Sequence, residues 1–203
     1  MEVNEEFFEE NKKVDPKDDK KQTLDYLRDL ISLVAGVMLL FALAFRVVVV
    51  SGPSMNNTLY NGDLLVVLGN VLYAEPKQHD IVVVSKESFD NGKPIIKRVV
   101  ATEGQTVDID FYRGVVIVDG QELVEEYCLT PTNMQEGVQF PLTVSEGCIF
   151  VMGDNRNESK DSRSPDIGLV DCREVIGRAV FLVFPGASRD TGTRDFSRIG
   201  VIS

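Results

Sequence analysis

A serine in a tight turn and a lysine in an apolar run are the two residues of this chain best suited to nucleophilic hydrolysis. The serine is Ser54, in Ser51-Gly-Pro-Ser-Met55, and the lysine is Lys97, in Ile95-Ile-Lys-Arg-Val-Val100. A serine hydroxyl is a poor nucleophile until a base takes its proton. Burial lowers the pKa of a lysine because desolvation disfavours the charged form, so apolar neighbours would make Lys97 a base. A Ser-Lys pair is one variant of the serine-hydrolase site.

Both residues also have ordinary structural interpretations. Ser54 could be a surface serine in a turn, and Lys97 could snorkel from a strand edge. The chemical interpretation has its own support, because Gly52-Pro53 forces a turn that presents the Ser54 side chain and frees its N–H, which can stabilise an oxyanion. In addition, consecutive strand residues point to opposite faces, so either Lys97 or Arg98 is expected to face inward.

A dense polar stretch follows the apolar residues 149–152. It reads Gly153-Asp-Asn-Arg-Asn-Glu-Ser-Lys-Asp-Ser-Arg163. Asp and Arg at such spacing can form bidentate pairs that rigidify a loop, whereas a solvated charge run is the alternative. The single histidine, His79, is interpreted as a turn residue. A Ser-His-Asp triad would therefore need His79 itself as its base, and a two-histidine metal site is excluded.

Composition narrows the function classes. The chain has 203 residues, with 21 Lys and Arg against 32 Asp and Glu, which gives a formal net charge of −11. A nucleic-acid-binding domain is expected to carry a basic face, so nucleic acid is not an expected partner. The three cysteines, Cys128, Cys148 and Cys172, lack metal-site spacing and allow at most one internal disulfide among three possible pairs. No metal or cofactor is expected.

One segment is apolar enough to cross a membrane. Residues 30–45 are uncharged, and a span usually needs ~20 residues, so we expect a transmembrane anchor over 24–46 behind a charged tail over 1–23. A buried core helix and a cleavable signal peptide are the alternatives. Basic residues near a span mark its cytoplasmic side. Because they are concentrated before the span, the N-terminus is expected to be cytoplasmic and the rest of the chain extracytoplasmic.

The remainder of the chain predicts an all-β domain over 47–186. Short β-branched runs alternate with Gly, Asn and Asp turn signals, a pattern typical of antiparallel sheets. The predicted strands are 47–50, 64–68, 81–85, 95–102, 106–110, 115–118, 149–152 and 175–183. Within the domain, 103–145 is interpreted as an inserted non-catalytic region. The segment 187–203 is a polar C-terminal tail with little to bury beyond Phe196, Ile199 and Val201.

The order of these segments resembles the type I signal peptidase family, in its bacterial Ser-Lys branch. A membrane span, SGPSMNNTL, HDIVVV, KRVVATEG and GDNRNESKDSR follow one another over approximately residues 25–185. The last of these motifs is highly specific. The resemblance implies a mostly antiparallel coiled β-sheet of the signal-peptidase and LexA-like type after one transmembrane helix. It also implies a membrane-bound serine endopeptidase that removes signal peptides from exported pre-proteins.

The resemblance assigns roles position by position. Ser54 matches the nucleophile, Lys97 the general base, and Met55 a residue shaping the substrate pocket. Ser159 matches a serine that hydrogen-bonds to the lysine and orients it. The other matching positions are supporting ones: an ion pair between Asp161 and Arg163, and a loop held close to the site by Gly153, Asp154 and Arg156. Implied partners are secretory pre-proteins with small residues at −1 and −3, together with membrane lipids.

The sequence departs from the family pattern at several positions. Asn57 replaces the usual proline after the nucleophile, and Gly52 stands where some members have a serine that completes the oxyanion hole. The hole is therefore expected to rely on the Ser54 N–H with water or a neighbouring group. Two other functions remain as alternatives. One is a catalytically silent membrane-anchored binding module, and the other is a self-cleaving LexA-like Ser-Lys peptidase.

Overall fold

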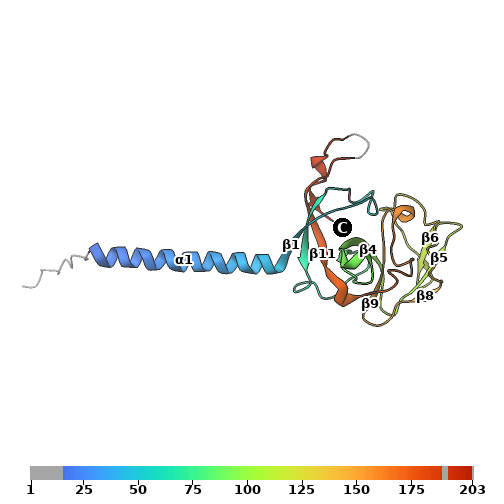
Figure 1. Ribbon diagram of the computed structural model, residues 1–203, viewed down its shortest axis with the longest axis horizontal. Helices are drawn as coiled ribbons and strands as arrows, with labels where there is room; N and C mark the ends of the chain where they lie inside the picture. The colour runs from blue at the N-terminus through green and yellow to red at the C-terminus, as the bar shows by residue number, and fades with distance from the viewer. Residues whose placement is uncertain (1–15, 189–191, 203) are drawn as a thin grey trace, which may run out of the picture. The chain divides into compact units, whose positions relative to one another are not determined.

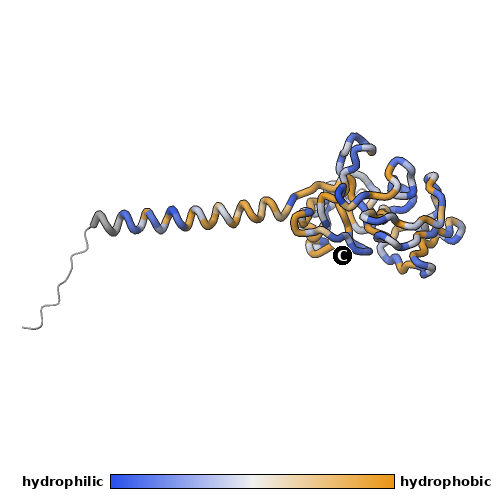
Figure 2. Tube along the Cα trace, turned by 90° about the horizontal axis from the view of Figure 1, so that it is seen from below, coloured by the Kyte–Doolittle hydropathy of each residue, from blue (hydrophilic) through white to orange (hydrophobic). Residues whose placement is uncertain are grey.

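The computed structural model describes residues 16–188 and 192–202, which form two units. The first unit consists essentially of one helix, α1 (Pro16–Ala44), whose sequence turns from charged to apolar along its length (Figure 2). Its segment Lys21–Ala44 is long and apolar enough to cross a membrane, with a mean hydropathy of 2.0. The predicted tail over 1–23 is thus helical from Pro16 onward, and residues 1–15 lie outside the described part. Proline suits the first turn of a helix because the N–H it lacks would have no partner there.

The second unit is a β domain with two antiparallel sheets (Figure 1). Strands of the larger sheet follow in the spatial order β1 (Phe45–Val49), β2 (Leu64–Gly69), β11 (Val175–Phe184), β3 (Ile81–Val84), β4 (Ile95–Thr102), β9 (Cys148–Met152) and β10 (Val170–Asp171), with β12 (Gly200–Val201) paired to β11. The all-β, mostly antiparallel prediction is therefore confirmed. All eight strands predicted from the sequence are present, with their ends shifted by at most a few residues.

A smaller sheet occupies the predicted insertion over 103–145. Its strands follow in the order β7 (Gln121–Glu122), β6 (Val115–Val118), β5 (Thr106–Asp110) and β8 (Leu142–Thr143). The strands β5, β6 and β8 lie at the opposite side of the domain from β1 and β11 (Figure 1). The insertion is thus a folded layer with its own apolar face, which includes the buried residues Val107 and Val116.

The burial of three strands shows how the larger sheet packs in the core. In β2 every second residue is buried, because successive side chains of a strand point to opposite faces. All four residues of β3 are buried, because this central strand is covered on both faces. Most residues of β4 are buried as well, and they include the charged side chains of Lys97 and Arg98. Both residues of this pair face the interior, whereas alternation predicted burial for one.

The C-terminal segment buries a different residue from those expected from the sequence. Phe196, Ile199 and Val201 are exposed, whereas Ile202 is buried in the core. The reason is local pairing. Strand β12 lies against β11, and the Ile202 N–H donates to the Val180 carbonyl, which turns the Ile202 side chain inward. Short 3-10 helices complete the chain at Asp90–Gly92, Arg156–Glu158, Cys172–Glu174 and Phe196–Arg198.

Candidate active site

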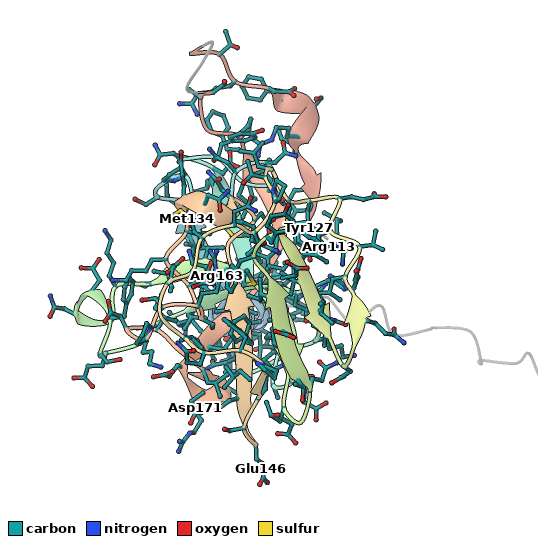
Figure 3. All side chains as sticks on the ribbon, turned by 90° about the vertical axis from the view of Figure 1, so that its right-hand side faces the viewer. Arg113, Tyr127, Met134, Glu146, Arg163 and Asp171 are labelled. Atoms are coloured by element: carbon teal, nitrogen blue, oxygen red, sulfur yellow. The ribbon has the colours of Figure 1, made fainter. Side chains whose placement is uncertain are left out.

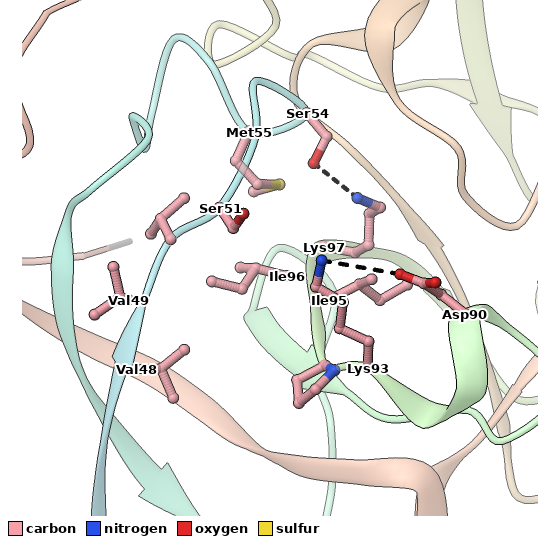
Figure 4. Close-up of a pocket in the computed structure, with 12 residues that line it drawn as sticks. Val48, Val49, Ser51, Ser54, Met55, Asp90, Lys93, Ile95, Ile96 and Lys97 are labelled. Carbon is pink, nitrogen blue, oxygen red and sulfur yellow. Dashed lines mark hydrogen bonds and ion pairs between the residues drawn. The ribbon is translucent and has the colours of Figure 1, made fainter.

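Ser54 and Lys97 meet at one end of a pocket in the β domain (Figure 4). Lys97 Nζ donates a hydrogen bond of 2.8 Å to Ser54 Oγ. The pocket has a volume of about 120 Å³ and is lined by residues 48–51, Ser54, Met55, Asp90 and residues 93–97. Ser54 comes from the turn after β1, and Lys97 comes from β4. The two residues singled out from the sequence are therefore brought into contact by separate elements.

Lys97 has the environment of a general base. Its side chain is only 3% exposed, and burial lowers its pKa from 10.5 to about 8. The carboxylates of Asp161, Glu136 and Asp154 oppose this shift because they favour the ammonium form. Desolvation exceeds their combined effect. A neutral amine 2.8 Å from a serine hydroxyl can accept its proton.

The turn that carries Ser54 depends on Gly52. This residue has φ +93°, a conformation that L side chains rarely adopt, and its N–H donates to the Asn61 side chain. A serine residue in place of Gly52 would thus be strained at this φ, although its Cβ would meet nothing within 4 Å. Within the described part of the chain, the Ser54 N–H donates no hydrogen bond. This N–H is consequently available as an oxyanion donor.

The polar loop over residues 153–163 supports the backbone of the nucleophile through hydrogen bonds. The Asn155 N–H donates to the Ser54 carbonyl at 3.0 Å, and its side-chain amide donates to the Pro53 carbonyl at 3.3 Å. Gly153 is packed so closely that a Cβ there would collide with the Ser54 carbonyl and the Ser159 side chain. The loop therefore fixes the backbone on which the reactive hydroxyl stands.

Two fully buried ion pairs shape this loop. Arg163 Nε donates to Asp161 Oδ1 at 2.8 Å, and Arg163 Nη2 donates to Asp161 Oδ2 at 2.8 Å, as the sequence predicted for this pair. Asp161 also accepts from the Gly153 N–H. The second pair joins different elements, because Asp154 of the loop accepts two 2.9 Å hydrogen bonds from Arg98 of β4. Since Arg98 follows Lys97 directly, this fork holds the loop against the strand that carries the base.

Met55 lies in the pocket, whereas Ser159 lacks the hydrogen bond to Lys97 that the resemblance implies. Met55 is buried and lines the pocket beside Ser54. Ser159 is also buried and lies against Gly153, but its hydroxyl makes no hydrogen bond within the described residues. The expected contact between Ser159 and Lys97 is therefore absent from this structure, in which the lysine bonds to Ser54 instead.

The Arg156 side chain bonds to its own loop and to the insertion. Its Nε donates to the Gly153 carbonyl at 3.1 Å, and its two terminal nitrogens donate to Glu125 at 2.5 and 2.6 Å. Sequence reasoning missed Glu125 because it belongs to an acidic run in the insertion, which is typical of a solvated surface. It also missed Tyr127, whose ring lies 4.0 Å from the Arg98 guanidinium carbon.

His79 and the cysteines take no part in the pocket. His79 has φ +74° in a turn, and its carbonyl accepts a 2.9 Å hydrogen bond from Arg98. Cys128, Cys148 and Cys172 are free thiols. Among the described residues, no group of His, Cys, Asp and Glu side chains is arranged to hold a metal ion.

Comparisons with known proteins agree on one family. Residues 23–184 match the family described as signal peptidase, peptidase S26. A Synechocystis protein named "Probable signal peptidase I-1" is 38% identical over 165 residues, covering 78% of this chain and 80% of its own length. Signal peptidase I of Bacillus licheniformis is 33% identical, covering 82% of this chain and 91% of its own. A crystal structure of a signal peptidase I from Enterococcus faecalis aligns with a TM-score of 0.43 at 30% identity, over 51% of this chain and 96% of that one.

Proposed function

The chain belongs to the signal peptidase family, peptidase S26, and from this membership we propose that Ser54 and Lys97 carry out its reaction. The protein is a serine endopeptidase that removes N-terminal signal peptides from exported pre-proteins. The observation that supports the residue assignment is the 2.8 Å hydrogen bond from a buried lysine to a serine hydroxyl. A silent binding module would not need this pair, and a self-cleaving regulator is not favoured by the relatives.

The proposed mechanism follows from the protonation state of the pair. Neutral Lys97 takes the proton of the Ser54 hydroxyl while Oγ attacks the scissile carbonyl carbon. The tetrahedral oxyanion accepts a hydrogen bond from the Ser54 N–H. The Lys97 ammonium then gives its proton to the leaving amine, and an acyl-enzyme remains on Ser54. Lys97 next takes a proton from water, whose oxygen attacks the ester carbonyl. The Lys97 ammonium then returns this proton to the departing Ser54 Oγ, which releases the signal peptide and restores the neutral amine.

The pocket supports a preference for small residues at −1 and −3 of the substrate. Its volume of about 120 Å³ leaves little room beside Met55 and Ile96. Among the described strands, β1 pairs with β2 alone, so its other edge is open to an added strand. The pairing of β4 with β9 begins only at Arg98, which leaves residues 95–97 open on that side. We infer that the substrate lies extended between these edges, so that alternate side chains enter the pocket.

We further propose that the protein is anchored with its β domain outside the cytoplasm and in contact with lipid. The apolar helix α1 and the family suggest a membrane-anchored enzyme. The basic residues before the span support the orientation. Exposed apolar side chains on the β domain, such as Val49, Val183 and Val201, support lipid contact.

Cleavage of a pre-protein in detergent micelles tests the function. The full chain should release a mature protein whose N-terminus begins after the small −1 residue, as read by N-terminal sequencing. Ser54→Ala should release none. A pre-protein with a bulky residue such as phenylalanine at −1 should resist cleavage, and equal cleavage of both substrates would overturn the proposed pocket.

A further inference from the structure

A short segment of the insertion reaches the loop that supports Ser54. We call residues 125–129, which lie between β7 and β8 in the chain, the strap. Glu125 accepts two hydrogen bonds, of 2.5 and 2.6 Å, from the terminal nitrogens of Arg156. Both side chains are largely buried, at 11% and 1% exposure. Thr132, just beyond the strap, accepts a further 3.0 Å bond from Arg156. The Arg156 guanidinium is therefore fixed from the insertion side.

The strap also touches the second arginine of the site. The Tyr127 ring covers the Arg98 guanidinium at 4.0 Å, a cation–π distance, and its hydroxyl donates to Glu125 at 3.1 Å. Figure 3 labels Tyr127 beside the smaller sheet. The Leu129 N–H donates to the Asp154 carbonyl at 3.3 Å. The strap thus contacts both arginines, Arg156 through Glu125 and Arg98 through Tyr127. It also contacts the loop backbone through Leu129.

A continuous set of contacts leads from Glu125 to the nucleophile. Arg156 bridges Glu125 and the Gly153 carbonyl. Gly153 packs directly against the Ser54 carbonyl, and Asn155 donates to the same carbonyl. A buried arginine that loses its carboxylate is left with an uncompensated charge and moves toward a new partner. Such a movement would release the Gly153 carbonyl and with it the support of Ser54.

We propose that Glu125 is a positioning residue for the peptidase reaction and that the insertion contributes to the active site through the strap. Glu125 touches neither substrate nor reacting atoms. It sets the geometry of residues 153–155 and so the aim of Ser54 Oγ at the scissile carbonyl. The insertion over 103–145 thus takes part in the reaction indirectly, although it contributes no reacting group. This proposal rests on the assignment of Ser54 as nucleophile.

The matched test compares two acidic residues of the same insertion. Glu125→Gln removes the charge at the buried pair, whereas Glu122→Gln removes it at the exposed pair between Glu122 and Arg113. Cleavage by the full chain in micelles is measured well below the unfolding temperature of each variant. Glu125→Gln should lower kcat at least about tenfold with KM nearly unchanged, because misaimed groups slow the reaction more than they weaken binding. Glu122→Gln should match the wild type.

Two further variants keep the test decisive. Glu125→Asp retains the charge and should restore part of kcat. If Glu125→Gln fails to fold, Tyr127→Leu, which removes the ring from Arg98, should lower kcat in the same way. The proposal is overturned if the strap variant that folds, Glu125→Gln or Tyr127→Leu, has the same kcat as Glu122→Gln. It is also overturned if the fractional loss of kcat in that variant equals its unfolded fraction, as measured by circular dichroism. Ser54→Ala in parallel separates the proposals, because residual cleavage there would refute the nucleophile assignment itself.

Discussion

Asn155 donates its backbone N–H to the carbonyl of Ser54 at 3.0 Å. The polar loop over 153–163 therefore supports a residue that lies far earlier in the chain. The same loop is fixed to β4 through Asp154 and Arg98, next to Lys97. One rigid loop thereby sets the position of both members of the reacting pair.

The pH dependence of cleavage should report the neutral form of Lys97. Because burial lowers its pKa from 10.5 to about 8, kcat/KM should rise with pH and level off above about pH 8. Below that value the rate should fall about tenfold per pH unit, as one proton must be lost. The measurement is kcat/KM across this range on one peptide substrate. A limb near pH 10.5 would contradict burial of the base.

Lys97 should lower the stability of the folded protein at neutral pH. A pKa that falls from 10.5 to about 8 corresponds to about 3 kcal/mol against the folded state. The full cost applies below about pH 8, where both states are protonated, and it disappears as the pH rises through 10.5. Lys97→Met should therefore raise the free energy of unfolding at pH 7 and abolish cleavage. Denaturant titration of the two proteins measures this difference, and a less stable Lys97→Met would refute it.

Gly153 should tolerate no side chain. A Cβ there would collide with the Ser54 carbonyl and the Ser159 hydroxyl, so Gly153→Ala should displace the nucleophile. A misplacement of this kind can lower kcat about 10²-fold. Gly200→Ala is the matched control, because a Cβ at Gly200 meets nothing within 4 Å. Similar kcat values for the two variants would show that the contact has no functional weight.

Breaking the buried pair between Arg98 and Asp154 should destabilise the domain strongly. Asp154→Asn leaves the Arg98 charge buried without its partner, at a cost of roughly 3–5 kcal/mol. Asp166→Asn removes the carboxylate of an exposed pair with Lys160 and should cost about 1 kcal/mol or less. Thermal unfolding of both variants gives the comparison. Equal shifts in Tm would mean that burial adds nothing to the pair.

The parts that could be predicted from the sequence are those with a local signal. Runs of β-branched residues predicted the strands β1–β6, β9 and β11, because side-chain period and composition act within a few residues. The strands β8, β10 and β12 were missed. Each has two residues, too few to show any periodicity.

Within the site, residue type predicted the reacting pair and long-range packing decided the rest. The pairing of Asp161 with Arg163 spans two positions and was predicted, whereas Arg98 with Asp154 and Arg156 with Glu125 join distant segments. No pattern along the chain distinguishes the buried Glu125 from its exposed neighbour Glu122. Only the folded strap separates them.

The measurement that tests the central assignment most directly is cleavage of one pre-protein by Lys97→Ala beside the wild type. Circular dichroism of both proteins serves as the control for folding. Loss of a general base lowers kcat/KM by about 10²–10⁴-fold, and we expect a loss in this range with the fold intact. A folded Lys97→Ala that retains most of the wild-type kcat/KM would contradict the Ser54–Lys97 mechanism.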